Sequence, residues 1–186
     1  MKTHFDIEKI IENGSITNEL DYERALVADR KLRLLSKKNT HFKTMRQNLR
    51  DLIEQYEKSE WNKVESFSAE KIIESDTAER IAETERVFIE NRKQEIRYKL
   101  KELDLSQADL AFLLGHRSKT HMSELINGIK PFTLKDLIII HHLLKIEITK
   151  LVPVYLSIED QLKTKEAIRQ LDKPQINFLS DNLMLA

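Results

Sequence analysis

The sequence LSQADLAFLLG at residues 105–115 decides the fold of this chain, together with two segments that follow it, SKTHMSELING at 118–128 and TLKDLIIIHHLL at 133–144. Ser106 and Asp109 have the spacing of a capping box, in which a hydroxyl and a carboxylate three residues later cap the first turn of a helix. Leucine-rich runs then follow, with apolar side chains recurring at helical steps. The stretch therefore predicts two short helices and a longer apolar one.

The ends of the two short helices are marked by glycine and serine. Gly115 lies where the chain must leave a helix at 107–114, because glycine tolerates the positive φ of such an end. Ser118 can then cap a second helix at 119–127, which ends at Gly128. Two short helices joined by a tight turn form a helix-turn-helix, which places its second helix in the major groove of DNA.

The second short helix has one apolar and one polar face. Met122, Leu125 and Ile126 recur at steps of three and four, so we expect them to pack inward. The outward positions carry Lys, Thr, Ser, Glu and Asn, which can reach base edges, and the flanking basic residues suit phosphates. The candidate DNA-contacting residues are Gln107, Arg117, Ser118, Lys119, Thr120, Ser123, Glu124, Asn127 and Lys130.

The core of this unit is predicted to come from the helices on either side. Thr133 and Asp136 repeat the capping-box spacing and open an apolar helix that covers the core. The side chains predicted to point into that core are Leu110, Leu113, Leu114, Leu134, Leu137, Ile138, Ile140, Leu143 and Leu144.

Residues 105–115 resemble the opening of the Cro/C1-type (XRE) helix-turn-helix, and residues 118–128 resemble the HigA antitoxin branch of that family. Residues 17–26 are similar to the N-terminal part of some HigA antitoxins. The resemblance implies a five-helix DNA-binding domain in a homodimer that represses its own operon. It also implies a small mRNA-cleaving toxin that binds the helices outside this domain. Carried over by position, the implied DNA contacts are Gln107, Lys119, Thr120 and Ser123.

The rest of the chain is predicted to be helical, so the fold class is all-α. Only three Gly and three Pro occur in 186 residues, which argues against a turn-rich β fold. We expect helices at 3–12, 19–35 and 40–60. Residues 69–103 form one helix or two with a bend near 75–77, and the polar composition of 74–86 predicts a weakly packed or extended connector.

The predicted organisation has three parts. Residues 1–90 are a helical N-terminal region for toxin binding or dimerisation, and 91–153 are the helix-turn-helix domain. Residues 154–186 are a helical tail, in which a capping box at Ser157 opens a helix to about Leu171. A last amphipathic segment is expected at 175–185.

Several classes of function are not expected. The chain has no Cys, which removes disulfides, thiol nucleophiles and cysteine-based zinc sites. His141 and His142 are neighbours on a helix and point about 100° apart, so they do not form a joint metal site. No catalytic motif is recognisable, and no cofactor is expected. Because the first residues lack the apolar core of a signal peptide and no run is long enough to span a membrane, we expect a cytoplasmic protein. Because no catalytic motif is recognisable, we also expect that it is not an enzyme.

Charge is unevenly distributed although the net charge is zero. Residues 30–50 hold eight Lys and Arg and no acid, whereas 51–90 hold twelve acids against five basic residues. The basic stretch is a solvated helix surface or a second nucleic-acid surface, and the acidic stretch is an ordinary surface or one complementary to a basic toxin.

Three functions remain open from the sequence. The first is an antitoxin that represses its operon, and the second is a stand-alone dimeric repressor without a toxin partner. The third is a protein-interaction module that has lost DNA binding, for which Glu124 and the neutral net charge are the motivation.

Overall fold

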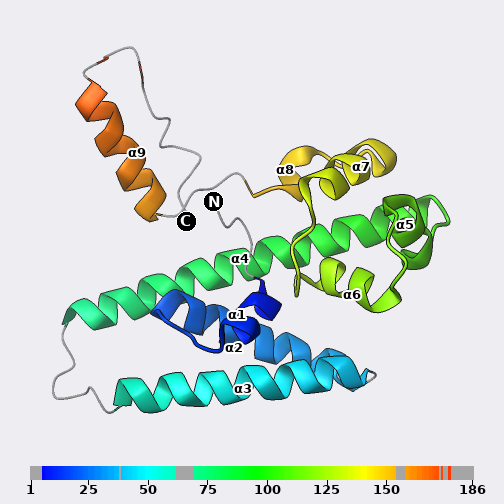
Figure 1. Cartoon of the computed structure of the whole chain (residues 1–186). Helices are drawn as coiled ribbons and strands as arrows, with labels where there is room; N and C mark the ends of the chain where they lie inside the picture. Colours follow the sequence, from blue (N-terminus) through cyan, green and yellow to red (C-terminus); the bar gives the residue numbers. More distant parts are fainter. Residues whose placement is uncertain are drawn as a thin grey trace.

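The computed structural model describes residues 6–37, 39–61, 69–153 and 158–171, with the single residues 173 and 176. All regular secondary structure within these residues is α-helical, which confirms the prediction of an all-α fold. Figure 1 shows a long central helix with one group of helices against each of its halves.

The N-terminal helices pack against one another around their own core. They are α1 (Ile7–Asn13), α2 (Glu19–Leu35) and α3 (Thr40–Trp61). The side chain of Asn18 caps α2 by accepting a hydrogen bond from the Asp21 N–H at 2.8 Å. The N-terminal core comprises Ile7, Ile10, Ile16, Ala25, Ala28, Leu32, Phe42, Met45, Leu49, Leu52, Ile53 and Ile129.

Two tyrosines tie α2 to α3. The rings of Tyr22 and Tyr56 stack with centroids 4.9 Å apart. The Tyr22 hydroxyl donates to Glu57 at 2.8 Å, and the Tyr56 hydroxyl donates to Glu19 at 2.9 Å. Burial, together with these hydrogen bonds to carboxylates, raises the pKa of both phenols well above its usual value. Both hydroxyls therefore remain donors at physiological pH and hold the two helices in register.

Residues 69–102 form a single helix, α4 (Ala69–Glu102), which resolves the choice between one helix and two. The predicted boundary between residues 90 and 91 falls inside this helix, and no break separates the two groups of helices there. The first half of α4 lies against α2, and its second half carries Ile96 and Leu100 into the core of the helices that follow. The same helix therefore packs against both groups of helices.

The prediction of a weakly packed connector at 74–86 is wrong. Ala78 and Ala82 are only 4% and 3% exposed, because these small side chains let α4 approach its neighbours closely. Arg24 on α2 donates to Glu85 on α4, at 2.8 Å from its Nε, and adds an ion pair to this contact. The polar side chains of this segment cover the solvent side of a packed helix.

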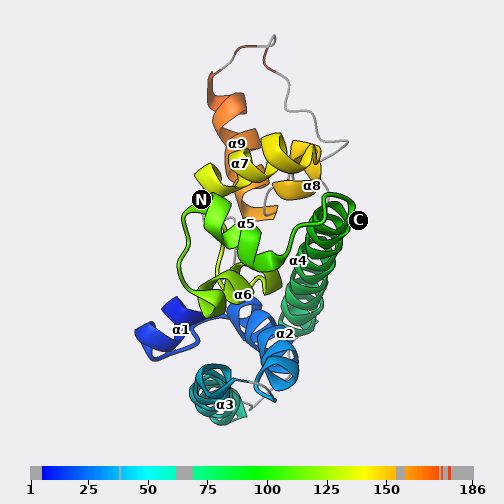
Figure 2. The ribbon, with the colours of Figure 1, turned by 90° about the vertical axis from the view of Figure 1, so that its right-hand side faces the viewer.

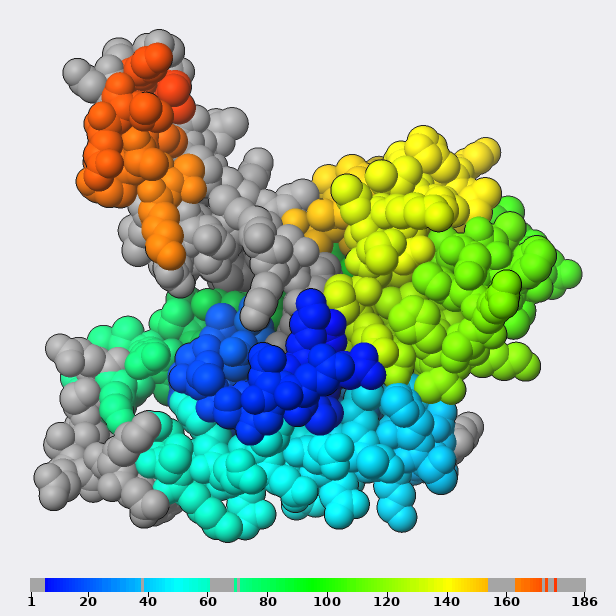
Figure 3. Space-filling view, in the orientation of Figure 1, coloured from blue at the N-terminus to red at the C-terminus, as the bar shows by residue number. Residues whose placement is uncertain are grey.

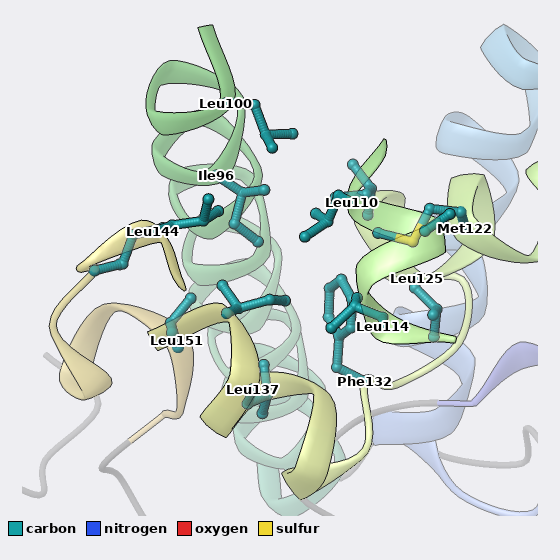
Figure 4. Packing of buried hydrophobic residues seen from close by; sticks show 14 residues of the cluster. Ile96, Leu100, Leu110, Leu114, Met122, Leu125, Phe132, Leu137, Leu144 and Leu151 are labelled. Carbon is teal, nitrogen blue, oxygen red and sulfur yellow. The ribbon is translucent and has the colours of Figure 1, made fainter. Parts of the chain in front are cut away.

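Four helices complete the second group. They are α5 (Gln107–Leu114), α6 (Lys119–Asn127), α7 (Leu134–Leu144) and α8 (Ile148–Leu151). The bounds of α5 and α6 agree with the prediction. Figure 4 shows how their side chains converge on the second half of α4. The C-terminal core comprises Ile96, Leu100, Leu110, Ala111, Leu114, Met122, Leu125, Ile126, Phe132, Leu137, Ile140, Leu144, Ile146 and Leu151.

Four apolar side chains predicted to lie in this core are exposed instead. In α7 the buried positions are Leu137, Ile140 and Leu144, which follow one another at steps of three and four. The opposite side of the helix has no covering element among the described residues, so its leucines and isoleucine face outward. The residues whose predicted burial is wrong are Leu113 on α5 and Leu134, Ile138 and Leu143 on α7.

The last described helix is α9 (Ile158–Leu171), close to the predicted bounds. None of its described side chains belongs to either core. Ser157 and all of 175–185 except Ile176 lie outside the described residues, and with them the cap and the last segment expected there. Within the described part of the chain, every helix is too short or too polar to cross a lipid bilayer.

Candidate nucleic-acid interface

The unit formed by α5, the turn and α6 has the caps expected from its sequence. The Ser106 hydroxyl accepts from the Asp109 N–H and the Asp109 carboxylate accepts from the Ser106 N–H, which completes the capping box of α5. Gly115 has φ of 81° and ends α5 in the left-handed conformation. Ser118 caps α6 by accepting from the His121 N–H at 3.1 Å. The turn is therefore fixed at both ends by local hydrogen bonds.

A second capping box joins the turn to α7. The carboxylate of Asp136 accepts from the Thr133 N–H at 3.1 Å and from its hydroxyl at 2.7 Å. Its other oxygen lies 3.2 Å from Nε2 of His116, which stands in the turn before α6. Asp136 is buried, so this carboxylate holds the start of α7 against the turn.

Three candidate DNA contacts are exposed together at the start of α6. Arg117 and Ser118 lie in the turn, and Lys119 is the first residue of the helix. A recognition helix contacts base edges mainly through its N-terminal residues, and phosphates lie on either side. The N-terminal end of α6 is therefore the accessible part of the candidate interface.

Gln107 lies beside two basic residues that the sequence reasoning missed. As the first residue of α5 it is half-buried in a groove lined also by Arg97 and Lys101 from the end of α4. Arg97 and Lys101 are four residues apart and so share one face of that helix. The groove joins a side-chain amide to two exposed cations, which suit a phosphate, and to the carboxylates of Asp104 and Asp109, which would repel one. The four-residue step of basic residues just before the unit is the signal that could have found it.

The polar face of α6 is covered by the N-terminal helices, contrary to the prediction that it lies outward. Thr120, Glu124 and Asn127 follow at steps of four and three and form one stripe, opposite the side chains that enter the C-terminal core. Glu124 is 3% exposed and Asn127 is 6% exposed. In Figure 3 the blue and cyan N-terminal helices abut the yellow-green surface of this region, and Figure 2 shows α1 and α2 beside α6.

Contacts from the N-terminal region run along the whole stripe. Asn39, just before α3, donates to the Thr120 hydroxyl at 3.4 Å. His41 Nε2 lies 2.7 Å from Glu124 Oε1. On α2, the Lys31 ammonium donates to the backbone carbonyl of Asn127 at 2.7 Å. The outward placement predicted for Glu124 and Asn127 is therefore wrong.

Glu124 is the centre of a group of ionic contacts. Its Oε2 lies 3.4 Å from His121 Nδ1 and 3.3 Å from the Lys130 ammonium. Lys130 reaches in turn to Glu8 on α1, at 2.5 Å. Although burial opposes it, these two carboxylates hold the pKa of Lys130 above its usual value. Lys130 therefore stays charged, but its ammonium group is already paired with the carboxylate of Glu8 in the N-terminal region.

Of the remaining candidates, Ser123 is half-buried and bonded within its own helix. The Asn127 amide donates to the Ser123 carbonyl at 2.8 Å and to its hydroxyl at 3.3 Å. These bonds fix the last turn of α6. The structure thus divides the predicted contacts into an accessible set at the N-terminal end and a covered set along the helix.

Lys31 is expected to make the free energy of unfolding depend on pH. Burial, with repulsion from nearby Lys93, lowers the pKa of Lys31 to about 8 from its usual value of 10.5. Between these two values the unfolded chain binds more protons than the folded one, so stability rises with pH. We expect the free energy of unfolding of the wild type, relative to Lys31→Met, to increase by about 2 kcal/mol from pH 7 to pH 10. Urea unfolding of both proteins at the two pH values measures this, and a constant difference would show that Lys31 is not desolvated.

No metal site is evident in the part of the chain that the structure describes, where no group of three or more His, Asp or Glu side chains is placed to hold an ion. Comparison of the chain with family models, with curated proteins and with solved structures finds no match.

Proposed function

We propose that the chain is a DNA-binding regulator, in which α5, the turn and α6 act as a Cro/C1-type helix-turn-helix. The second half of α4, with α5 to α8, would be its five helices. The observation that carries this proposal is the set of cations at the N-terminal ends of the two short helices. Arg117 and Lys119 stand at the start of α6, and Arg97 and Lys101 stand beside the start of α5. Such ends face the DNA in helix-turn-helix proteins.

Replacing the two cations at the start of α6 should weaken DNA binding. For Arg117→Ala/Lys119→Ala we expect a Kd for duplex DNA roughly 5- to 150-fold larger, since the two lost contacts together contribute of the order of 1–3 kcal/mol. The salt dependence of log Kd should also become shallower by about one to two charges. Fluorescence anisotropy with a random-sequence duplex pool measures both.

The matched control removes two exposed cations elsewhere. Arg50→Ala/Arg80→Ala makes the same change in net charge on α3 and α4. It should leave the affinity within a few-fold of wild type, because distant charges are screened. Equal losses in the two double variants would mean that only net charge attracts DNA and that α6 is not its reading helix.

Within this class we propose an antitoxin of the HigA type, which represses its own operon as a homodimer in the cytoplasm. Its partner would be a ribonuclease toxin bound by the N-terminal helices. The resemblance of residues 105–128 supports this role, and so does an N-terminal region with a hydrophobic core of its own. The acid-rich stretch at 51–90 offers electrostatic complementarity to a basic toxin.

Co-expression with the neighbouring open reading frames tests the antitoxin role. We expect a small basic protein to co-elute in stoichiometric amounts and to arrest growth when it is expressed alone. A homodimer that purifies without any companion would instead favour the stand-alone repressor.

The burial of Glu124 and Asn127 favours a second candidate, a protein-interaction module without DNA binding. In that case the polar stripe of α6 serves only to join the two cores. This candidate requires that no duplex DNA complex forms at low salt, whereas a phosphate-contacting regulator binds and then dissociates steeply as salt rises.

A further inference from the structure

The face of α6 that turns away from its own core is the one that a reading helix must offer to DNA. Met122, Leu125 and Ile126 fix the orientation of the helix because they are buried in the C-terminal core. The stripe of Thr120, Glu124 and Asn127 lies on the other side, under the N-terminal helices. A helix in the major groove needs the space that α1, α2 and the start of α3 fill.

The contacts on this stripe differ from those of a permanent core. Four of them are polar or ionic: Asn39 to Thr120, His41 to Glu124, Lys31 to the Asn127 carbonyl and Glu8 to Lys130. Each such contact contributes only a modest net free energy, because water replaces it when the interface opens. Apolar packing also holds the closed form: Ile129 is fully buried in the N-terminal core, its carbonyl accepts from the Ile7 N–H at 3.3 Å, and α2 lies along α4. Opening must separate these contacts too.

Glu8 also occupies the position beside Lys130 that a phosphate of bound DNA would take. Lys130 follows α6 directly, a position suited to the DNA backbone, and the Glu8 carboxylate is 2.5 Å from its ammonium. A carboxylate and a phosphate oxygen compete for the same donor. DNA binding therefore requires that this ion pair break and that α1, α2 and the start of α3 move off α6.

We propose, on the basis of the DNA-binding function argued above, that α1, α2 and the start of α3 form an intramolecular lid that competes with duplex DNA for the polar face of α6. The closed form is the one described here, and only an open form binds DNA. The apparent affinity for DNA is then reduced by the fraction of molecules that are open. A partner that binds the N-terminal helices would change operator binding through this equilibrium.

A cross-link between the lid and α6 tests the proposal directly. Because the chain has no cysteine, Asn39→Cys/Thr120→Cys introduces the only two thiols, at side chains that touch in the closed form. The variant is compared with itself, before and after treatment with a short bismaleimide, so the substitutions cancel. We expect the cross-linked protein to bind a random-sequence duplex pool at least about tenfold more weakly than the untreated protein.

The matched control places a cross-link inside the lid alone. In Asp29→Cys/Arg46→Cys the bridge replaces the ion pair between α2 and α3, whose atoms are 2.8 Å apart. This cross-link should leave DNA binding unchanged. Equal affinity of the Asn39–Thr120 variant with and without its bridge would overturn the lid while leaving DNA binding intact. Failure of the bridge to form, seen by mass spectrometry, would show that α3 does not lie on α6 and would also overturn it.

A single charge change tests the part played by Glu8. Glu8→Gln removes the competitor of phosphate on Lys130, and Glu12→Gln removes an equal charge from an exposed position on the same helix. We expect Glu8→Gln to bind the duplex pool at least about threefold more tightly than Glu12→Gln, since the open fraction rises. Equal affinities would overturn the role of Glu8. If none of these proteins, cross-linked or not, binds DNA, the DNA-binding function itself is overturned, and the lid with it.

Discussion

Ile129→Ala is expected to lower the free energy of unfolding by about 3 kcal/mol, within the range measured for truncation of buried aliphatic side chains. Ile129 is 0% exposed, and it belongs to the N-terminal core although it follows α6 in sequence. Its carbonyl also accepts a hydrogen bond from the Ile7 N–H at 3.3 Å. The substitution therefore leaves a cavity at the joint between the two cores, and both should lose stability.

Urea unfolding followed by circular dichroism measures this loss, with Ile73→Ala as the control. Ile73 is 65% exposed on α4, so the same truncation there should change stability by less than about 0.5 kcal/mol. Hydrogen exchange adds a local readout, because amides of α1 and α6 should exchange faster together in Ile129→Ala. A loss no larger than that of Ile73→Ala would show that Ile129 does not join the two cores in solution.

The local structure of the helix-turn-helix segment could be predicted closely from its sequence, because its signals are local. Each capping side chain bonds to backbone within three residues, as Ser118 does at α6, and each helix ends at a glycine with positive φ. Such hydrogen bonds depend on neighbouring residues alone and not on the rest of the fold. The bounds 107–114 and 119–127 follow from them.

The covering of α6 could not be predicted in the same way, because it depends on residues far away in the chain. Glu124 is polar and lies on the polar side of an amphipathic helix, which favours exposure in any local reading. Its burial comes from His41, 83 residues earlier. The predicted burial of Leu134 is wrong for the converse reason. This apolar side chain is exposed because no element of the described chain covers it.

The prediction for residues 74–86 was wrong because the packing there depends on small residues. Ala78 and Ala82 carry little hydrophobic signal, so the sequence of residues 74–86 predicts a polar connector. In the structure their small size is what lets α4 pack closely against its neighbours, and both side chains are buried there. The same holds for the contact between α4 and the end of α6, where a glycine makes the close approach possible.

Gly128→Ala is expected to destabilise the protein by about 2–4 kcal/mol, for two separate reasons. Gly128 has φ of 66°, a left-handed conformation that costs a residue with a Cβ roughly 1–2 kcal/mol. A Cβ at this position would also lie 2.5 Å from Cγ2 of Ile89 on α4. Cγ2 is attached directly to a branched Cβ, so it cannot move away without a change of rotamer or a shift of the helix.

The two costs can be measured separately because the chain offers a control for each. Gly14 ends α1 with φ of 69°, and a Cβ added there would meet nothing within 4 Å, so Gly14→Ala carries the conformational cost alone. Ile89→Ala removes the clashing methyl group, so Gly128→Ala should cost less in that background, with a coupling of about 1 kcal/mol or more in the double-mutant cycle. Urea unfolding of the four proteins gives the coupling. If Gly128→Ala costs no more than Gly14→Ala, or costs the same with and without Ile89, then α4 does not approach the end of α6 as closely as described. The contact that joins the helix-turn-helix segment to the shared helix would then lie elsewhere.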